Sequence, residues 1–215
     1  MSEILKGRVA IITGAGGGLG AAHAKVFASE GCAVVVNDIN TEAAQSVVDE
    51  IIAAGGKAVV NSSDITNYDD SLNAIKQALE SYGDLHIVLN NAGVNRDRMF
   101  ASMTEQEWDT IMAVHLKGHF CISSHAVHYW RGRSKEGKPV DARIINTTSG
   151  AGLQGSIGQS NYAAAKAGIA ALTLNQAAEL GRYNITANAV APSARTGMTS
   201  AVPEMAERMA KPEDG

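Results

Sequence analysis

The stretch Val9-Ala-Ile-Ile-Thr-Gly-Ala-Gly-Gly-Gly-Leu-Gly20 decides the fold of this chain. Its apolar, β-branched start is typical of a buried strand, its glycines of a tight turn, and residues 21–30 of a helix. A turn without side chains lets a pyrophosphate approach the backbone, and the start of the helix offers it unpaired N–H groups. The stretch therefore predicts a dinucleotide site. The cofactor contacts expected in it are Gly14, Gly18, Leu19 and Gly20.

A second apolar run, residues 33–36, leads through Asn37 to Asp38, which lies 18 positions after Gly20. An acid at about this distance accepts hydrogen bonds from the ribose hydroxyls of adenosine and repels a 2′-phosphate. Lys25 is the only lysine or arginine between Thr13 and Asp38. We therefore predict NAD rather than NADP as the cofactor. The alternative role of Asp38 is that of a helix or turn cap.

The composition bounds the class of protein. A chain of 215 residues with 45% hydrophobic and 19% charged residues suffices for one α/β domain, expected to span residues 1–215. The net charge of −4 argues against a nucleic-acid partner. The two cysteines stand in apolar contexts, which argues against a disulfide framework. Because neither a signal peptide nor a membrane-spanning run is recognisable, we expect a cytoplasmic protein.

Strand-like and helix-like segments alternate along the chain, which predicts a doubly wound, Rossmann-like parallel sheet with ligands bound beyond the carboxyl ends of its strands. We expect strands at 8–13, 33–38, 57–61, 86–90, 142–147 and 185–190. We expect helices at 18–30, 41–54, 68–82, 104–130 and 160–181. Thr104 and Glu107 have the spacing of a capping box. The helix at 160–181 is rich in small residues, which favours burial either on the sheet or against a second subunit.

The residues that point to a chemistry are Ser149, Tyr162 and Lys166. Tyr162 and Lys166 are four positions apart and share one face of a helix. A neighbouring ammonium group favours the phenolate, and the positive ring of an oxidised nicotinamide would add to this effect. Tyr162 could then exchange a proton with an alcohol or carbonyl oxygen while hydride moves, and Ser149 could hydrogen-bond the same oxygen. The alternatives are an incidental surface pair and a Ser–Lys hydrolase, for which no nucleophile elbow is present.

Two further segments follow predicted strands and are open to two interpretations. They are Asn90-Asn91-Ala92-Gly93 and Asp64-Ile65. Either segment could be a simple turn, because Asn, Asp and Gly favour turns. As ligand contacts, Asp64, Ile65, Asn91, Ala92 and Gly93 would lie beside the adenine of the cofactor.

Together these motifs resemble the short-chain dehydrogenases/reductases. The likeness rests on Thr13-Gly14-x-x-x-Gly18-x-Gly20, the Asn-Asn-Ala-Gly segment, Ser149 with Tyr162-x-x-x-Lys166, and Asn188-Ala-Val-Ala-Pro192. It implies that Tyr162 is the acid/base and that Ser149 polarises the carbonyl. It also implies that Lys166 holds the nicotinamide ribose and lowers the pKa of the tyrosine, and that Pro192 lies at the cofactor.

His115 departs from the usual pattern of this family. Many members place an asparagine there, which holds a water in a proton relay. The histidine resembles the (3R)-hydroxyacyl-CoA dehydrogenase part of multifunctional β-oxidation enzymes and related bacterial proteins, whose expected substrates are acyl-CoA or sterol derivatives. His115 is a catalytic candidate, either as the holder of the relay water or as a packed side chain. It is one turn from His119, but without an evident third ligand we expect no metal site.

We therefore expect an NAD-dependent oxidoreductase of lipid metabolism that interconverts a secondary alcohol and a ketone, with a 3-hydroxyacyl-CoA as substrate. The alternatives are a 3-oxoacyl-carrier-protein reductase, a hydroxysteroid dehydrogenase and, from another class, a non-catalytic nucleotide sensor. A homodimer or homotetramer is expected. Family members usually have one more strand and helix, so the last strand is expected to be missing from this chain, which stops in what resembles the substrate loop.

Overall fold

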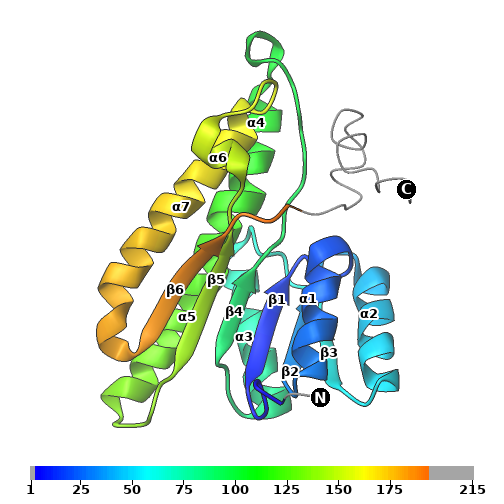
Figure 1. Ribbon diagram of the computed structural model, residues 1–215, viewed down its shortest axis with the longest axis vertical. Helices are drawn as coiled ribbons and strands as arrows, with labels where there is room; N and C mark the ends of the chain where they lie inside the picture. Colours follow the sequence, from blue (N-terminus) through cyan, green and yellow to red (C-terminus); the bar gives the residue numbers. More distant parts are fainter. Residues whose placement is uncertain (1–2, 194–215) are drawn as a thin grey trace, which may run out of the picture.

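The computed structural model describes residues 3–193, and a six-stranded, all-parallel sheet runs through them (Figure 1). The strand order is β3-β2-β1-β4-β5-β6. The strands are β1 (Val9–Thr13), β2 (Ala33–Asn37), β3 (Lys57–Asn61), β4 (Ile87–Asn90), β5 (Ala142–Thr147) and β6 (Ile185–Val190). Because the order reverses between β1 and β4, the carboxyl ends of these two strands form the switch point at which such sheets bind ligands.

Helices cover both faces of the sheet (Figure 1). They are α1 (Gly18–Ser29), α2 (Thr41–Ala53), α3 (Tyr68–Tyr82), α4 (Glu105–Ile111), α5 (Gly118–Lys135), α6 (Gly150–Gln154) and α7 (Ser160–Leu180). Apolar residues of α1 and α2 pack on one face, where the core includes Ile12, Val34 and Ile51. Side chains of α3 and α5 pack on the other face around Trp130 and Ile144. The expected doubly wound α/β fold is thus confirmed.

The strands lie within one residue of their expected bounds, but the long helix expected at 104–130 is interrupted. A π-helical segment, η2 (Met112–Lys117), separates α4 from α5, which continues to Lys135. The periodicity of apolar residues does not reveal one extra residue in a turn, so the interruption could not be predicted. The short helix α6 and the 3₁₀ turns η1 (Phe100–Ser102) and η3 (Gly181–Tyr183) were also not expected, because each spans five residues or fewer.

The capping box is confirmed at the start of α4. The side chain of Thr104 accepts the N–H of Glu107, and the Glu107 carboxylate accepts the N–H of Thr104. The expectation of a missing last strand concerns the chain after β6, and residues 194–215 lie outside the described range. Within residues 3–193, every helix is either too short or too polar to cross a bilayer.

The parallel register brings polar strand ends to a single edge of the sheet. Thr13 is level with Asn37, Asn37 with Asn61, and Asn90 with Asn146. All five side chains are buried, and the amides bond one another, as from Asn37 to Asn61 and from Asn90 to Asn146. This edge is therefore polar and rigid, and it supports the loops that carry the candidate site.

Candidate active site

Two glycines of the turn after β1 leave no room for a side chain. Gly14 has a φ of +62°, and a Cβ on it would lie 2.6 Å from the Cα of Ala92. A Cβ on Gly20 would collide with the carbonyl oxygen of Gly14. The N-cap of α1 is Gly17, which gives the helix no side-chain cap. The N–H groups of the first turn of α1 therefore remain without a side-chain acceptor, as a pyrophosphate site requires.

Asp38 closes the same turn from the carboxyl end of β2. Its Oδ2 accepts the N–H of Gly16 at 3.0 Å, and its Oδ1 accepts the N–H of Asn40 at 2.9 Å. The carboxylate is half-buried and lies next to the glycines. Asp38 thus does cap a turn. Each carboxylate oxygen retains a second lone pair, so the capping role leaves room for ribose hydroxyls.

Thr13 and Asn91 join the glycine turn to β4. The buried Oγ1 of Thr13 accepts the N–H groups of Asn91 and Ala92 at 3.0 and 3.1 Å. The amide of Asn91 donates to the carbonyls of Thr13 and Gly14. Asn91 therefore braces the cofactor turn with its side chain. The part played by Thr13 was missed from sequence, although a polar residue that ends an apolar strand is a signal for it.

The other expected cofactor contacts fall into different environments. The Asp64 side chain is exposed and accepts from the backbone and hydroxyl of Thr66. Ile65 is buried in the core on the α5 side of the sheet, where its side chain leaves no room for a Cβ on Gly118. Pro192 is exposed just after β6. Ile65 is therefore a core residue, and only its backbone is left to contact a ligand.

Ser149, Tyr162 and Lys166 come together at the carboxyl end of β5. Ser149 is the N-cap of α6, and its Oγ accepts the N–H of Ala151 at 3.2 Å. Tyr162 and Lys166 lie on one face of α7, with the Nζ of Lys166 5.5 Å from the centre of the tyrosine ring. The side chain of Ser149 lies near enough to Tyr162 to lower the pKa of its hydroxyl. The expected trio thus forms one cluster.

The expected acidification of Tyr162 is not produced by the protein's own groups. Burial raises the pKa of Tyr162, the hydroxyl of Ser149 lowers it, and the charge of Asp97 raises it. Burial also lowers the pKa of Lys166 to about 7, and its Nζ donates to the carbonyl oxygen of Thr147 at 2.6 Å. An amine with a pKa near 7 is neutral for part of the time, and this one donates to the carbonyl of Thr147 instead of facing the phenol. Lys166 is therefore a weak source of positive charge for Tyr162. The expectation is wrong in this respect, because spacing on a helix does not reveal desolvation.

His115 lies on η2 and faces Tyr162. The two ring centres are 5.2 Å apart and the rings are perpendicular. The Nε2 of His115 lies 2.8 Å from the carbonyl oxygen of Val94, and Gly93 lies against the ring so closely that a Cβ there would clash. Burial first, and the charge of Lys166 second, lower the pKa of His115 to about 3. The imidazole is therefore neutral near pH 7 and fixed to the loop after β4.

A hydrogen-bonded pair of loops borders the trio and was not predicted. Gln159 donates to the Oδ2 of Asp97 at 3.0 Å, and the buried Asn161 donates to the carbonyl of Arg96. The N–H of Arg98 donates to the carbonyl of Gly158 at 2.7 Å. These bonds fix the loop after β4 against the start of α7, beside Tyr162. They join residues 60 or more positions apart, which no local pattern in the sequence indicates.

The remaining histidines of the long helical region have separate surroundings. His119 is fully buried, whereas His125 and His128 contact the carbonyls of Tyr68 and Ser124. Over residues 3–193, no group of three or more histidine, cysteine or acidic side chains is placed to hold a metal ion.

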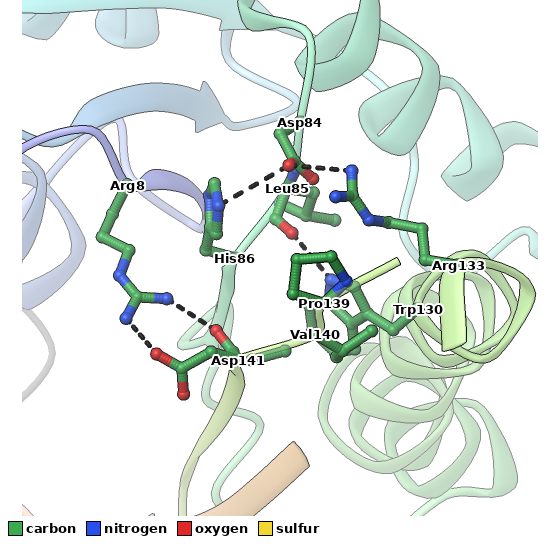
Figure 2. A pocket seen from close by; sticks show the side chains of 10 residues that line it. Arg8, Asp84, Leu85, His86, Trp130, Arg133, Pro139, Val140 and Asp141 are labelled. Atoms are coloured by element: carbon green, nitrogen blue, oxygen red, sulfur yellow. Dashed lines mark hydrogen bonds and ion pairs between the residues drawn. The ribbon is translucent and has the colours of Figure 1, made fainter. Parts of the chain in front are cut away.

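A cavity of about 260 Å³ lies at the opposite, amino-terminal edge of the sheet (Figure 2). Figure 2 shows Arg8 turned toward Asp141 and Arg133 toward Asp84. The floor includes Trp130, whose indole N–H donates to the carbonyl of Leu85. Because the charged groups of this cavity already pair with one another, it offers no free charge to a nucleotide, and we place the candidate site at the carboxyl edge.

Comparison with known proteins agrees with this geometry. The model of the short chain dehydrogenase family matches residues 8–207. Hydroxyacyl-CoA dehydrogenase ChsB1 of Mycobacterium tuberculosis is 50% identical over 205 residues, which are 92% of this chain and 64% of that protein. The peroxisomal hydratase-dehydrogenase-epimerase of Saccharomyces cerevisiae is 45% identical over 206 residues, 92% of this chain and 22% of that protein. The chain thus spans less than two thirds of the length of either relative.

A solved structure is similar over most of the chain. The crystal structure of a short chain dehydrogenase from Mycobacterium avium is 59% identical, with a TM-score of 0.88, and the match covers 91% of this chain and 70% of that one.

Proposed function

Because the chain belongs to the short chain dehydrogenase family, we propose that it is an NAD-dependent oxidoreductase that interconverts a secondary alcohol and a ketone. One observation carries the proposal: Ser149, Tyr162 and Lys166 cluster at the same edge of the sheet as the tightly packed glycine turn. A nicotinamide bound at that edge would supply the hydride donor or acceptor.

The side chains have distinct roles in this proposal. In the direction of reduction, Tyr162 donates its phenolic proton to the carbonyl oxygen of the substrate, and the Ser149 hydroxyl donates a hydrogen bond to the same oxygen. The raised pKa of Tyr162 suits this direction, because the phenol is protonated at neutral pH. Lys166 holds the nicotinamide ribose. Oxidation of the alcohol requires the phenolate, and the positive ring of the oxidised cofactor would favour that form.

The proposed cofactor contacts are Gly14, Gly18, Leu19, Gly20, Asp38, Asp64, Ile65, Asn91, Ala92, Gly93, Tyr162, Lys166 and Pro192. The preference for NAD rests on Asp38, whose carboxylate lies against the glycine turn and would repel a 2′-phosphate. We expect the purified protein to bind NADH more tightly than NADPH in fluorescence titrations. Asp38→Asn should narrow or reverse the difference, and tighter binding of NADPH by the unaltered protein would overturn this part of the proposal.

We propose a 3-hydroxyacyl-CoA as the substrate. The relative from Mycobacterium tuberculosis is named a hydroxyacyl-CoA dehydrogenase. The segment after β4 and the segment from α6 to α7 also expose large apolar side chains, which a flexible acyl chain could contact. These residues are Met99, Phe100, Leu153 and Ile157.

We further propose that residues 1–215 form a single domain, because one sheet runs from residue 9 to residue 190. A homodimer or homotetramer is proposed from α7, which exposes Leu174 and several small side chains that a second copy could cover. Light scattering at two concentrations tests the assembly. The cytoplasmic location stays a prediction.

The decisive experiment follows NADH oxidation with a 3-oxoacyl-CoA, a carrier-bound 3-oxoacyl group and a steroid ketone. We expect the CoA thioester to give the highest kcat/KM, and Tyr162→Phe to lower kcat by roughly 10²- to 10⁴-fold without weakening NADH binding. A preference for either of the other two substrates would replace the proposed one. Unchanged turnover in the Tyr162→Phe variant, or no turnover of any ketone, would overturn the dehydrogenase proposal and favour a nucleotide sensor.

A further inference from the structure

Three hydrogen bonds join the segment after β4 to the residues that precede Tyr162. They run from Asn161 to the carbonyl of Arg96 at 3.1 Å, from Gln159 to the carboxylate of Asp97 at 3.0 Å, and from the N–H of Arg98 to the carbonyl of Gly158 at 2.7 Å. The later a residue stands in one segment, the earlier its partner stands in the other, so the two segments lie antiparallel. We call residues 96–98 and 158–161 the clamp. The proposed mechanism uses Tyr162 but assigns no role to the clamp beside it.

Asn161 is the most deeply buried residue of the clamp, and it is 0% exposed. Its Nδ2 donates to the carbonyl of Arg96 at 3.1 Å and to the carbonyl of Glu107 in α4 at 3.3 Å. Its Oδ1 accepts the N–H of Tyr162 at 2.8 Å. Packing alone would not require an amide here, because each buried polar group costs free energy unless it is bonded. The side chain therefore joins the segment after β4 and α4 to the backbone of Tyr162.

The start of α7 has no side-chain cap at its N-cap residue, and the clamp takes the place of one. Gln159 is the N-cap residue, but its side chain donates to Asp97. The N–H groups of a first helical turn have no partners within the helix, and helix ends fray. Asn161 supplies an acceptor to one of these groups, the N–H of Tyr162. Because Tyr162 is the third residue of α7, the clamp fixes the helical turn that carries the phenol.

The ring of Tyr162 is fixed from the same segment after β4. It stands perpendicular to the ring of His115, with 5.2 Å between the two centres. The Nε2 of His115 lies 2.8 Å from the carbonyl oxygen of Val94, two residues before the clamp. The segment after β4 therefore holds the backbone of Tyr162 through Asn161 and its ring through His115.

We propose that Asn161 is a positioning residue, which acts through the clamp to hold the hydroxyl of Tyr162 at the distance at which it donates its proton to the substrate oxygen. The inference rests on the proposed dehydrogenase function. Proton transfer requires about 2.6–3.2 Å between the two oxygen atoms, and a displacement of about 1 Å can lower a rate roughly 100-fold. Asn161 has no titratable group, so its loss lowers kcat and leaves the pH dependence of kcat unchanged. Asp97 takes part as the acceptor of Gln159 and not through its charge.

One test does not depend on activity. Protein labelled with 3-fluorotyrosine carries five ¹⁹F labels, and Tyr162→Phe identifies the signal of Tyr162. In Asn161→Ala this signal should broaden and move toward that of free fluorotyrosine, whereas Tyr129, which bonds to Asp84 at the opposite edge of the sheet, should keep its signal. Asp97→Ala, at an exposed position, should have the same effect to a smaller extent and decides the question if Asn161→Ala does not fold. A Tyr162 signal that stays unchanged in every variant that folds would overturn the proposal.

The second test uses turnover. Asn161→Ala should lower kcat roughly 10- to 100-fold and leave both the KM for NADH and the inflections of the kcat profile against pH unchanged. Asp97→Ala should lower kcat about tenfold. Asp97→Asn, which keeps an acceptor for Gln159 but no charge, should recover most of that loss. Asn175→Ala, the same substitution at an exposed position of α7, should change nothing.

The results that would contradict the proposal differ for the two sites. A native kcat in Asn161→Ala, or a loss of kcat accompanied by an equal rise in the KM for NADH, would reduce Asn161 to a packing role. Equal losses in Asp97→Ala and Asp97→Asn would assign the effect to the charge of Asp97 and overturn the clamp. If the unaltered protein turns over no ketone, the proposed function fails, and the ¹⁹F signals still decide the inference.

Discussion

Lys166 lies where the requirements of stability and of chemistry conflict. Its side chain is 3% exposed, its ammonium donates to one backbone carbonyl, and no carboxylate acts on it. The folded protein therefore lowers the pKa of Lys166 from 10.5 to about 7, whereas the unfolded chain keeps the higher value. Burial of the ammonium therefore lowers the free energy of unfolding. This loss is absent above pH 10.5, grows as the pH falls toward 7, and reaches its full size below pH 7.

Replacement of Lys166 by methionine should stabilise the fold and abolish turnover. The shift of the pKa corresponds to several kcal/mol at pH 7, and the lost bond to Thr147 offsets about 1 kcal/mol of it. We expect the free energy of unfolding in urea to rise by roughly 2–4 kcal/mol at pH 7 and by less at pH 10. A variant that is less stable than the parent protein at pH 7 would contradict this account of Lys166.

At the scale of residues, the sequence was sufficient to predict which side chains meet but not their charge states. The spacing of Tyr162 and Lys166, and the position of Ser149 after a strand, correctly predicted one cluster. The protein alone raises the pKa of Tyr162 instead of lowering it, because desolvation depends on residues that are distant in the sequence. For the same reason Thr13 and Gln159 were missed, since each acts through bonds that span more than 60 positions.

At the scale of elements, strands were more predictable than helices. Five or six consecutive β-branched or apolar residues bounded by glycine or a polar residue leave few alternatives for a strand. The region from α4 to α5 has the composition of one helix, yet η2 divides it and directs His115 toward Tyr162. A π turn has poorer hydrogen-bond geometry than an α-helix, and such turns are frequent at functional sites. The position of η2 beside the candidate active site agrees with this tendency.

The glycine turn offers a matched pair of substitutions. A Cβ on Gly20 would overlap the carbonyl of Gly14, whereas a Cβ on Gly17 meets nothing within 4 Å. Gly17 also has an extended backbone that any residue adopts. Gly20→Ala should therefore weaken NADH binding by about tenfold or more and lower the melting temperature, while Gly17→Ala should retain the fold. Equal melting temperatures for the two variants would show that the backbone of the turn can shift to accommodate a Cβ on Gly20.

The capping box of α4 should make a separate contribution to stability. Its acid, Glu107, also accepts a hydrogen bond from Arg98. Thr104→Ala removes the side-chain acceptor for the N–H of Glu107 and should lower the free energy of unfolding by about 1 kcal/mol. The substitution should leave NADH affinity unchanged, because the cap is on a different element from the glycine turn. Urea denaturation and an NADH titration of the same sample check both statements.

For the whole molecule, the buried histidines predict how stability depends on pH. Burial lowers the pKa values of His23, His86, His115 and His119. Below pH 6.5 the unfolded chain binds protons that the folded protein does not, so the free energy of unfolding should fall as the pH drops from 6.5. His115 and His119 should each contribute about 1.4 kcal/mol per pH unit in that window.

This prediction is tested by urea denaturation between pH 5 and 7. The slope of the free energy of unfolding against pH should become shallower in His119→Leu by the equivalent of one proton. His128→Leu should leave the slope unchanged because His128 is exposed. A parent protein whose stability is independent of pH over this range would mean that the buried rings become charged within the fold.

The central strand β1 and the edge strand β6 should open locally at different rates. All five residues of β1 are buried, whereas Thr186, Asn188 and Val190 of β6 are exposed, and β6 is an edge strand among the described residues. Backbone amides of β6 should therefore take up deuterium from heavy water well before those of β1. Since β6 leads directly to Pro192 at the proposed cofactor site, addition of NADH should slow this uptake more than it slows uptake in β3.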